Sequence, residues 1–282
     1  MKAIILNLSA WVFLPFMDGI AKYLSADMPV LQITWARYFF TVAFTLPIMF
    51  LFFNKQLTWS EKPKLQIIRG IILLCANICF FYSISVISLA KALTLAFIAP
   101  LIVTALSPVI LGERVGVRRW TAVIVGFIGT LVVIRPGFVE LNLASFAALG
   151  TGVMYGFYLL ITRKLSTSDN PLLTLLLTGL TGFVIISFAM PFVWVQPTVN
   201  QWYLMGSIGV FAIIGHLFLI LSLKYADASK LAPFSYFEII TNIIIGYYFF
   251  SNFPDNWTFL GLFIIICSGI YISRRERIIS TN

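Results

Sequence analysis

Long apolar runs separated by short polar connections recur along the whole chain. Ten runs are of helix length, and the fifth and the last are the shortest: 3–24, 30–53, 66–87, 90–111, 118–134, 143–162, 172–193, 203–224, 229–250 and 257–273. A helix of about 20 residues crosses the roughly 30 Å hydrocarbon core of a bilayer. The pattern therefore predicts an all-α integral membrane protein with ten transmembrane helices.

Composition supports this class and excludes others. The chain of 282 residues is 60% hydrophobic and 10% charged, and its mean hydropathy is +0.99. A water-soluble domain this apolar could not cover its surface with polar groups. The net charge of +9 lies in short loops between apolar runs, so it does not indicate a nucleic-acid partner. With three cysteines inside apolar runs and a single histidine, we expect no metal site and no cofactor.

The distribution of basic residues predicts the orientation. With ten spans, both termini lie on one side, and the segments on that side hold 15 of the 19 Lys and Arg residues, Arg69 among them. The other side holds only Lys22, Arg37, Lys91 and Arg135. Because cytoplasmic loops of membrane proteins are enriched in Lys and Arg, we expect a multi-pass protein of the cell (inner) membrane with both termini in the cytoplasm.

The ninth run carries an acid near its middle, Glu238. A carboxylate at this depth costs on the order of 2.5 kcal/mol or more unless it faces a cavity or a partner. Ser235, Asn242 and Gly246 recur at helical spacing with this acid, so we expect them on one face of one helix. Pro233 interrupts the run, and a broken polar helix at the membrane midplane is typical of a solute path. The alternative is a protonated Glu238 that bonds to a neighbouring helix.

A weak internal repeat divides the chain into two halves. Each half carries a Leu-Ala pair, a proline and a Trp-Thr pair in the same order: Leu95-Ala96, Pro100, Trp120-Thr121, Leu231-Ala232, Pro233 and Trp257-Thr258. Because five spans is an odd number, two such halves must be inverted relative to each other in the membrane. We expect two inverted five-helix repeats, residues 1–138 and residues 139–282. Inverted repeats are common in transporters, which bind substrate between the halves.

Polar and aromatic side chains within the apolar runs are candidates for a solute site. The predicted substrate-binding residues are Glu238, Asn242, Tyr82, Asn77, Tyr155, Tyr158 and Tyr236. Tyrosine has an apolar face and a hydrogen-bonding end, which suits a zwitterionic or aromatic metabolite. An organic cation could also lie against such rings beside a carboxylate. The alternative for these tyrosines is packing between helices.

Four further residues are candidates for a gate or for coupling: Asp18, Lys22, Arg37 and His216. Asp18 and Lys22 are four residues apart, so they can pair on one helical face. Arg37 lies about two turns into the second run and needs a partner. With Asp18 it forms either an outer gate or a structural ion pair. His216 can relay protons, because imidazole changes its charge near neutral pH, or it can bond across helices.

The chain resembles a known family in both halves. In the first half the similar residues are Ala90-Lys91-Ala92, Pro100, Leu111-Gly112-Glu113-Arg114, Arg119-Trp120, Gly126-Phe127-Ile128-Gly129 and Arg135-Pro136. In the second half they are Ala226-Asp227-Ala228, Ala232-Pro233, Tyr236, Glu238, Gly246, Trp257-Thr258, Gly261 and Ser268-Gly269. These motifs resemble the EamA family of the drug/metabolite transporter superfamily. The stretches at Met17-Asp18, Arg37-Tyr38 and Tyr236-Phe237-Glu238 are similar to its branch of S-adenosylmethionine and riboflavin carriers.

This resemblance implies ten spans, two inverted five-helix repeats, cytoplasmic termini and a central cavity. The sequence departs from the family where many members have a Gly-Glu-like pair before the last span. Here the chain reads Phe250-Ser251-Asn252, which puts in doubt any role for an acid in that loop.

We therefore expect a secondary transporter that moves a small polar organic metabolite by alternating access. The solute would be amino acid-like, zwitterionic or cationic, and the lipid bilayer is the other partner. The alternatives are a membrane-embedded enzyme and a non-transporting membrane scaffold. An enzyme would need a nucleophile with a base or a metal cluster, and the chain has neither a G-x-S-x-G nor an H-E-x-x-H motif. We therefore expect no enzymatic activity.

Overall fold

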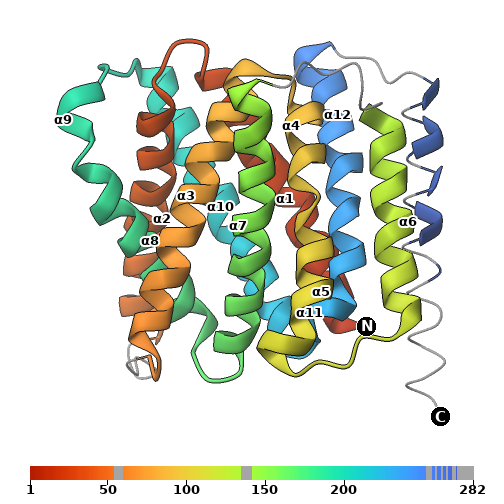
Figure 1. The fold of residues 1–282 in the computed structure, drawn as a ribbon. Helices are drawn as coiled ribbons and strands as arrows, with labels where there is room; N and C mark the ends of the chain where they lie inside the picture. Colours follow the sequence, from red (N-terminus) through yellow and green to blue (C-terminus); the bar gives the residue numbers. More distant parts are fainter. Residues whose placement is uncertain are drawn as a thin grey trace.

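In the computed structural model the chain forms a bundle of helices that run side by side (Figure 1). The structure describes residues 1–53, 60–134, 142–251, 256–257, 259–261, 263–264, 266–268 and 271, and no strand occurs among them. The helices are α1 (Lys2–Leu24), α2 (Val30–Phe53), α3 (Pro63–Val86), α4 (Leu89–Ala96), α5 (Ala99–Leu111), α6 (Val117–Ile134), α7 (Leu143–Ser166), α8 (Pro171–Ser187), α9 (Met190–Val193), α10 (Val199–Tyr225), α11 (Ala228–Leu231), the 3₁₀-helix η2 (Ala232–Phe237) and α12 (Glu238–Phe250).

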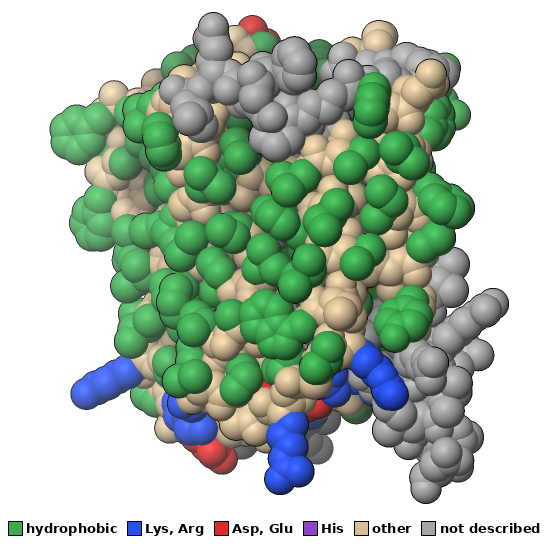
Figure 2. Space-filling model, turned by 45° about the vertical axis from the view of Figure 1, so that its right-hand side comes forward, with side chains coloured by type: hydrophobic (Ala, Val, Ile, Leu, Met, Phe, Trp, Pro, Cys, Tyr) green, Lys and Arg blue, Asp and Glu red, His purple; other side chains and the backbone are tan. Residues whose placement is uncertain are grey.

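Six helical segments of the described chain are long and apolar enough to cross a membrane. They are Lys2–Leu24, Val30–Leu51, Pro63–Val86, Ala92–Leu111, Leu143–Ser166 and Val199–Tyr225. Apolar side chains cover the visible face of the bundle as a broad band, and Lys and Arg side chains gather below it (Figure 2). A surface of this kind matches the hydrocarbon core of a bilayer. The protein is therefore an all-helical, multi-pass membrane protein. Of the last predicted run, 257–273, the structure describes residues 257, 259–261, 263–264, 266–268 and 271, which are helical, and Phe259–Ser268 is a shorter apolar helix.

One end of the bundle, here called the basic end, carries most of the described cations. The last turn of α7 contains Arg163 and Lys164, and the last turn of α10 contains Lys224. The chain begins at this end with α1, whereas α7 finishes there, so the two helices run in opposite directions (Figure 1).

Three of the predicted runs are not continuous α-helices. The run 90–111 forms α4 and α5, which are separated just before Pro100, and the run 172–193 forms α8 and α9. The run 229–250 is interrupted near Pro233, as predicted, because the chain passes from α11 through six residues of 3₁₀-helix before α12. Pro233 in this segment has no N–H to donate, which favours the break. Both broken regions, α4–α5 and α11–α12, lie close together in the bundle (Figure 1).

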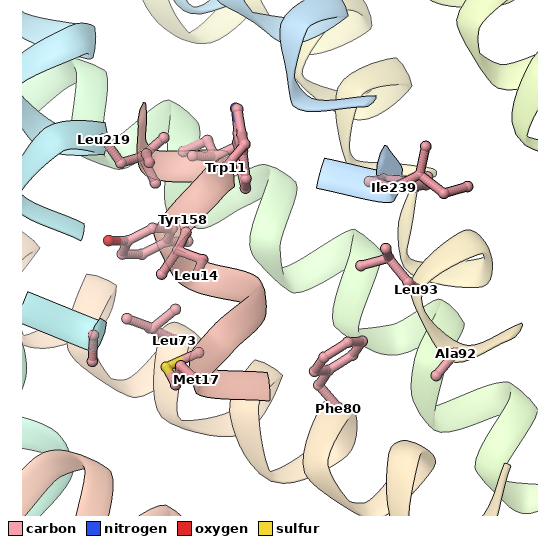
Figure 3. Close-up of a cluster of buried hydrophobic side chains, with 14 of the residues drawn as sticks. Trp11, Leu14, Met17, Leu73, Phe80, Ala92, Leu93, Tyr158, Leu219 and Ile239 are labelled. Atoms are coloured by element: carbon pink, nitrogen blue, oxygen red, sulfur yellow. The ribbon is translucent and has the colours of Figure 1, made fainter. Parts of the chain in front are cut away.

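Helices from distant parts of the chain pack along one another. The largest contacts join α1 with α10 and α3 with α7, followed by α2 with α8 and with α10. Glycine permits several close approaches, since a Cβ atom at Gly215 would collide with Leu14 and one at Gly182 would collide with Tyr38. One large hydrophobic cluster fills the centre, with Leu14 among its members (Figure 3). This packing positions the side chains of the candidate functional site at the centre of the bundle.

Candidate functional site

A cavity lies at the centre of the bundle, between α1, α3, α4, α7, α10, η2 and α12, and we call it the central cavity. It contains about 70 Å³ within which a water-sized molecule can move. Its polar lining consists of Asp18, Asn77, Thr151, His216, Ser235 and Glu238, and its aromatic lining of Trp11, Phe80, Phe97 and Tyr155. Sites for small organic molecules commonly combine an apolar wall with a few polar groups of this kind.

The apolar wall of the central cavity belongs to the main hydrophobic cluster. Leu14 and Met17 of α1 lie on one side, and Phe80 and Leu93 lie on the other (Figure 3). Trp11 completes this wall: its indole Nε1 donates to Asn7 at 2.8 Å, and its ring meets that of Tyr155 edge-on. The sequence analysis did not select Trp11. The available signal was an indole in mid-span with an amide four residues before it.

Two acids face this cavity from opposite parts of the chain. Asp18 of α1 is 4% exposed and Glu238, the first residue of α12, is 8% exposed. Both line the cavity, and neither carboxyl group has a hydrogen bond or ion pair with a described residue. Their placement is therefore consistent with the prediction that Glu238 faces a cavity, since a buried acid is costly unless a cavity or a partner receives it.

The structure does not form the predicted pair of Asp18 and Lys22. Instead, Lys22 Nζ donates to the carbonyl oxygens of Ile84 at 2.7 Å and Ile87 at 3.3 Å. These carbonyls lie where α3 ends and are left without donors from its own backbone. The ammonium group therefore caps α3 and does not neutralise the acid four residues before it.

Arg37 does not pair with an acid either. Its Nη2 lies 2.7 Å from His216 Nε2, and its Nε lies 3.2 Å from the sulfur of Met17. A guanidinium can only donate, so Nε2 accepts and the proton of the neutral imidazole lies on Nδ1. Nδ1 then donates to the hydroxyl of Tyr158 at 3.0 Å. His216 thus bonds across α2, α7 and α10, which is the alternative to a proton relay.

Arg69 continues this chain of hydrogen bonds, and its position was predicted wrongly. The sequence analysis counted it with the basic loops, but it is the seventh residue of α3 and is 0% exposed. It donates to the hydroxyl of Tyr158 at 2.8 Å, to Thr162 Oγ1 at 2.6 Å and to the carbonyl of Thr174 at 3.2 Å. It also donates to the hydroxyl of Thr178. Neutral oxygens from two helices, α7 and α8, therefore hold this buried charge.

The chain of polar contacts reaches the basic end through Gln66 and Asp169. Gln66 Nε2 donates to Thr174 Oγ1 at 3.0 Å and to Asp169 Oδ2 at 2.7 Å. Burial favours the neutral form of Asp169, but hydrogen bonds from Ser60, Gln66 and the backbone N–H of Glu61 outweigh this effect and lower its pKa. This loop carboxylate joins the start of α3 to the connection between α7 and α8.

Two of the predicted tyrosines act in packing and not at the cavity. Tyr236 donates to the carbonyl of Val123 at 3.2 Å, and its ring packs against Phe97. Tyr82 is half-buried on α3 and is not part of the lining of the central cavity. Tyr158 lies behind the cavity wall, where its ring stacks on Tyr155 at a centroid distance of 5.3 Å.

The two predicted amides differ in their roles. Asn77 lines the central cavity and donates to the hydroxyl of Tyr38 at 2.9 Å. Asn242 does not line the cavity, although it lies one turn after Glu238 in α12. Its Nδ2 donates to the carbonyl of Glu238 at 3.1 Å, and its buried Oδ1 has no donor.

A cluster of charged groups, which we call the basic-end lock, joins the two halves below the central cavity. Glu113 at the end of α5 accepts from the N–H groups of Ala228 at 2.9 Å and Ser229 at 3.0 Å. Arg163 lies 3.6 Å from Glu113 and 3.2 Å from Asp227. Arg119 adds contacts to Asp227 at 3.7 Å and to Ser229 Oγ at 2.9 Å.

The lock lies between the central cavity and the basic end. A second, smaller cavity on this side shares Trp11, Pro100, Leu159 and Ser235 with the central cavity. It contains about 20 Å³ of space for a water-sized molecule, which is too little for a metabolite among the described residues. The ion-pair partner of Glu113 among the described residues is Arg163.

A polar cavity enclosed by membrane-spanning helices, with a closed lock at one end, is the arrangement expected of a solute transporter. Comparison with known protein families leads to the same class of protein. The EamA-like transporter family profile matches residues 1–135 and 142–274, so the chain belongs to the EamA-like transporter family.

Curated relatives cover nearly the whole chain. It is 26% identical over 264 residues to the S-adenosylmethionine uptake transporter of Rickettsia prowazekii, covering 92% of this chain and 88% of the relative. The riboflavin transporter of Vibrio cholerae is 26% identical, with 96% and 94% covered. The pseudopaline exporter of Pseudomonas aeruginosa is 27% identical, with 93% and 92% covered. The protein is therefore a transporter of small molecules and not an enzyme.

A solved crystal structure has the same fold. Its TM-score to this protein is 0.80 at 16% sequence identity, and the alignment covers 97% of this chain and 98% of the other.

Proposed function

We propose that the protein carries a small polar organic metabolite across the cell (inner) membrane by alternating access. The substrate binds in the central cavity, which opens in turn to each side of the membrane. The observation that carries this proposal is the cavity itself, which lies between the two halves and is lined by buried polar groups from both.

The packing of the helices supports two inverted five-helix repeats, residues 1–138 and 139–282. In this scheme α1 corresponds to α7, α3 to α10, and the broken α4–α5 to the broken α11–α12. The contact of α1 with α10 is then the counterpart of that between α7 and α3, and the contact of α2 with α10 is the counterpart of that between α8 and α3. The opposite directions of α1 and α7 agree with inversion and with ten spans in all.

The orientation follows from the positions of the cations. The described Lys and Arg side chains of the connections gather at the basic end, where α1 begins. Under the positive-inside rule this end, where α1 begins, is cytoplasmic, and ten spans would bring both termini to that side. The basic-end lock would then be the closed cytoplasmic gate.

The relatives suggest the first compounds to test. Their names include carriers of S-adenosylmethionine and of riboflavin, both of which combine rings with polar groups. The central cavity offers Trp11 and Tyr155 as ring-stacking partners and Asn77, Ser235 and Thr151 as hydrogen-bonding groups. At about 70 Å³ it holds only a few water molecules in this closed state, so the two halves must separate to admit such a compound.

The test is uptake of radiolabelled S-adenosylmethionine and riboflavin into proteoliposomes. Ala96 lines the central cavity, so Ala96→Phe would fill it and abolish uptake. Ala26→Phe, at an exposed position between α1 and α2, is the matched control and should leave uptake unchanged. Uptake that survives the filling of the cavity would reject the proposed path. Failure of a broader metabolite panel to enter the liposomes would reject the transport of small polar metabolites itself.

A further inference from the structure

We propose that Asp18 and Glu238 form a shared two-carboxylate site that holds either protons or the positive group of an organic cation. Transport is then an exchange of a cation against protons. This inference rests on the proposed function and adds to it the charge of the substrate and the coupling ion.

The central cavity contains two carboxyl groups without hydrogen-bond donors in the part of the chain that the structure describes. Both carboxyl groups are more than nine-tenths buried, line the same cavity and have no donor among the described residues. A buried polar group without a partner costs about 1–3 kcal/mol, and more when it is charged. The site is therefore incomplete without a proton or a cation.

The described cations near the acids are already bonded elsewhere. Lys22 is held by the carbonyls of Ile84 and Ile87, and Arg37 by His216 and Met17. His216 presents no spare proton on Nε2, because that nitrogen accepts from the guanidinium. The titratable and charged groups that face the acids from the packed elements are Lys22 of α1, Arg37 of α2, Tyr155 and Tyr158 of α7, His216 of α10 and Tyr236 of η2. The side chain of Lys91 on α4 lies outside the described residues.

The size of the cavity decides what fills the site when no substrate is present. About 70 Å³ cannot provide two ionised carboxylates with the hydration that they have in bulk water. Two like charges in one narrow cavity also disfavour each other. In the empty cavity at least one carboxyl group therefore keeps its proton, and the site carries little net charge.

Binding of a cation favours the ionised form of a carboxyl group in this site. When a group of charge +1 enters, one carboxyl O–H bond breaks, the carboxylate keeps the electron pair, and the proton leaves to the water on the side to which the cavity is open. Trp11 and Tyr155 line the same space and can place the face of a ring against the cation. After release on the other side, a proton from that side restores the O–H bond. Each cycle exchanges one cation of charge +1 for one proton and includes no redox step.

A matched pair of probes tests the charge requirement. S-adenosylmethionine carries a sulfonium charge, and S-adenosylhomocysteine is the same molecule without the sulfonium methyl group and its charge. We expect the purified protein to bind the sulfonium compound more tightly, with an affinity that rises by up to about tenfold per pH unit for each displaced proton. The neutral sulfide should lack this pH dependence. Glu238→Gln and Asp18→Asn should each flatten it, whereas Asp27→Asn at an exposed site should not.

A measurement on the protein without solute tests the inference independently of the two probe compounds. An infrared titration of the empty protein should show a protonated carboxyl C=O band near neutral pH, which Glu238→Gln or Asp18→Asn removes and Asp27→Asn retains. Ionised carboxyl groups throughout the neutral range would overturn the proposal. So would equal affinity for the two probes, or an unchanged pH dependence in both cavity variants. Uptake of either compound without these effects would leave the transport proposal intact and reject only the exchange with protons.

Discussion

Two arginines, Arg37 and Arg69, show how this bundle accommodates charge at depth. Neither has a carboxylate partner among the described residues, and both donate to neutral atoms of neighbouring helices. Arg37 joins α2 to α1 and α10, and Arg69 joins α3 of the first half to α7 and α8 of the second, so these hydrogen bonds also fix the relative positions of the helices. Tyr158 and His216 link the two arginines through one continuous set of contacts. A substitution of any of these four residues should therefore lower the stability of the protein.

We predict that Arg69→Met destabilises the protein strongly. Methionine has a similar length but no donors, so the hydroxyls of Thr162 and Tyr158 and the carbonyl of Thr174 lose their partner. The expected cost is at least about 1–3 kcal/mol, the penalty for one unpaired buried polar group. Thermal unfolding in detergent measures it. Arg118→Met, at an exposed position of α6, is the matched control. Equal melting temperatures for the two variants would contradict this account.

At the scale of single residues, the sequence predicted which groups are unusual better than it predicted their partners. Glu238 was selected as an acid near the middle of an apolar run and Asp18 as a possible partner of Lys22 or Arg37, and both acids line the central cavity. Helical spacing showed that Lys22 could reach Asp18, but it could not reveal the free carbonyls at the end of α3, which compete for the ammonium. Arg69 was misplaced because hydropathy windows leave the ends of a helix uncertain by a few residues.

At the scale of elements, the broken helices explain why Tyr236 packs and does not line the cavity. The 3₁₀-helix η2 turns this ring toward α6, where it lies against Gly126. The sequence marked Pro233 as an interruption, which agrees with the structure. The length of the 3₁₀ segment could not be predicted, because it depends on the space that the neighbouring helices leave.

We predict opposite effects for two glycine substitutions. A Cβ atom at Gly126 would overlap the ring of Tyr236, whereas one at Gly246 meets nothing within 4 Å. Gly126→Ala should therefore lower stability by about 1–3 kcal/mol, the usual cost of overpacking. Gly246→Ala should be neutral or stabilising by up to about 1 kcal/mol, because alanine is the better helix former. Melting temperatures of the two variants check this, and a loss of stability at both positions would mean that helix propensity or lipid contact decides the outcome.

At the scale of the whole molecule, the contacts that hold the basic end together can be assigned to individual side chains. The basic-end lock holds α5, α6, α7 and α11 together through Glu113, Arg119, Arg163 and Asp227. The contacts are partly exposed, so each is individually weak. Such a cluster can keep one end shut and still separate within a transport cycle, which a large apolar interface could not do as readily.

We therefore predict that Glu113→Gln shifts the protein toward a state open at the basic end. The amide keeps the shape of the side chain but loses the charge that attracts Arg163 and strengthens the bonds to Ala228 and Ser229. A loss of about 1–2 kcal/mol would raise the open population roughly 5- to 30-fold. The reporter is Ser235→Cys, which lines both cavities, in a background where Cys75, Cys79 and Cys267 are serine.

Labelling with a membrane-impermeant thiol reagent distinguishes opening from general loosening. In Glu113→Gln, labelling from the basic end should accelerate while labelling from the opposite side slows, because one closed state is exchanged for another. Glu61→Gln, an exposed acid beside α3 at the same end, should change neither rate. Faster labelling from both sides would mean that the substitution loosens the bundle. Unchanged rates from both sides would mean that the charged cluster joins the halves without gating them, and closure would then have to come from the packing of Trp11, Pro100 and Leu159 above it.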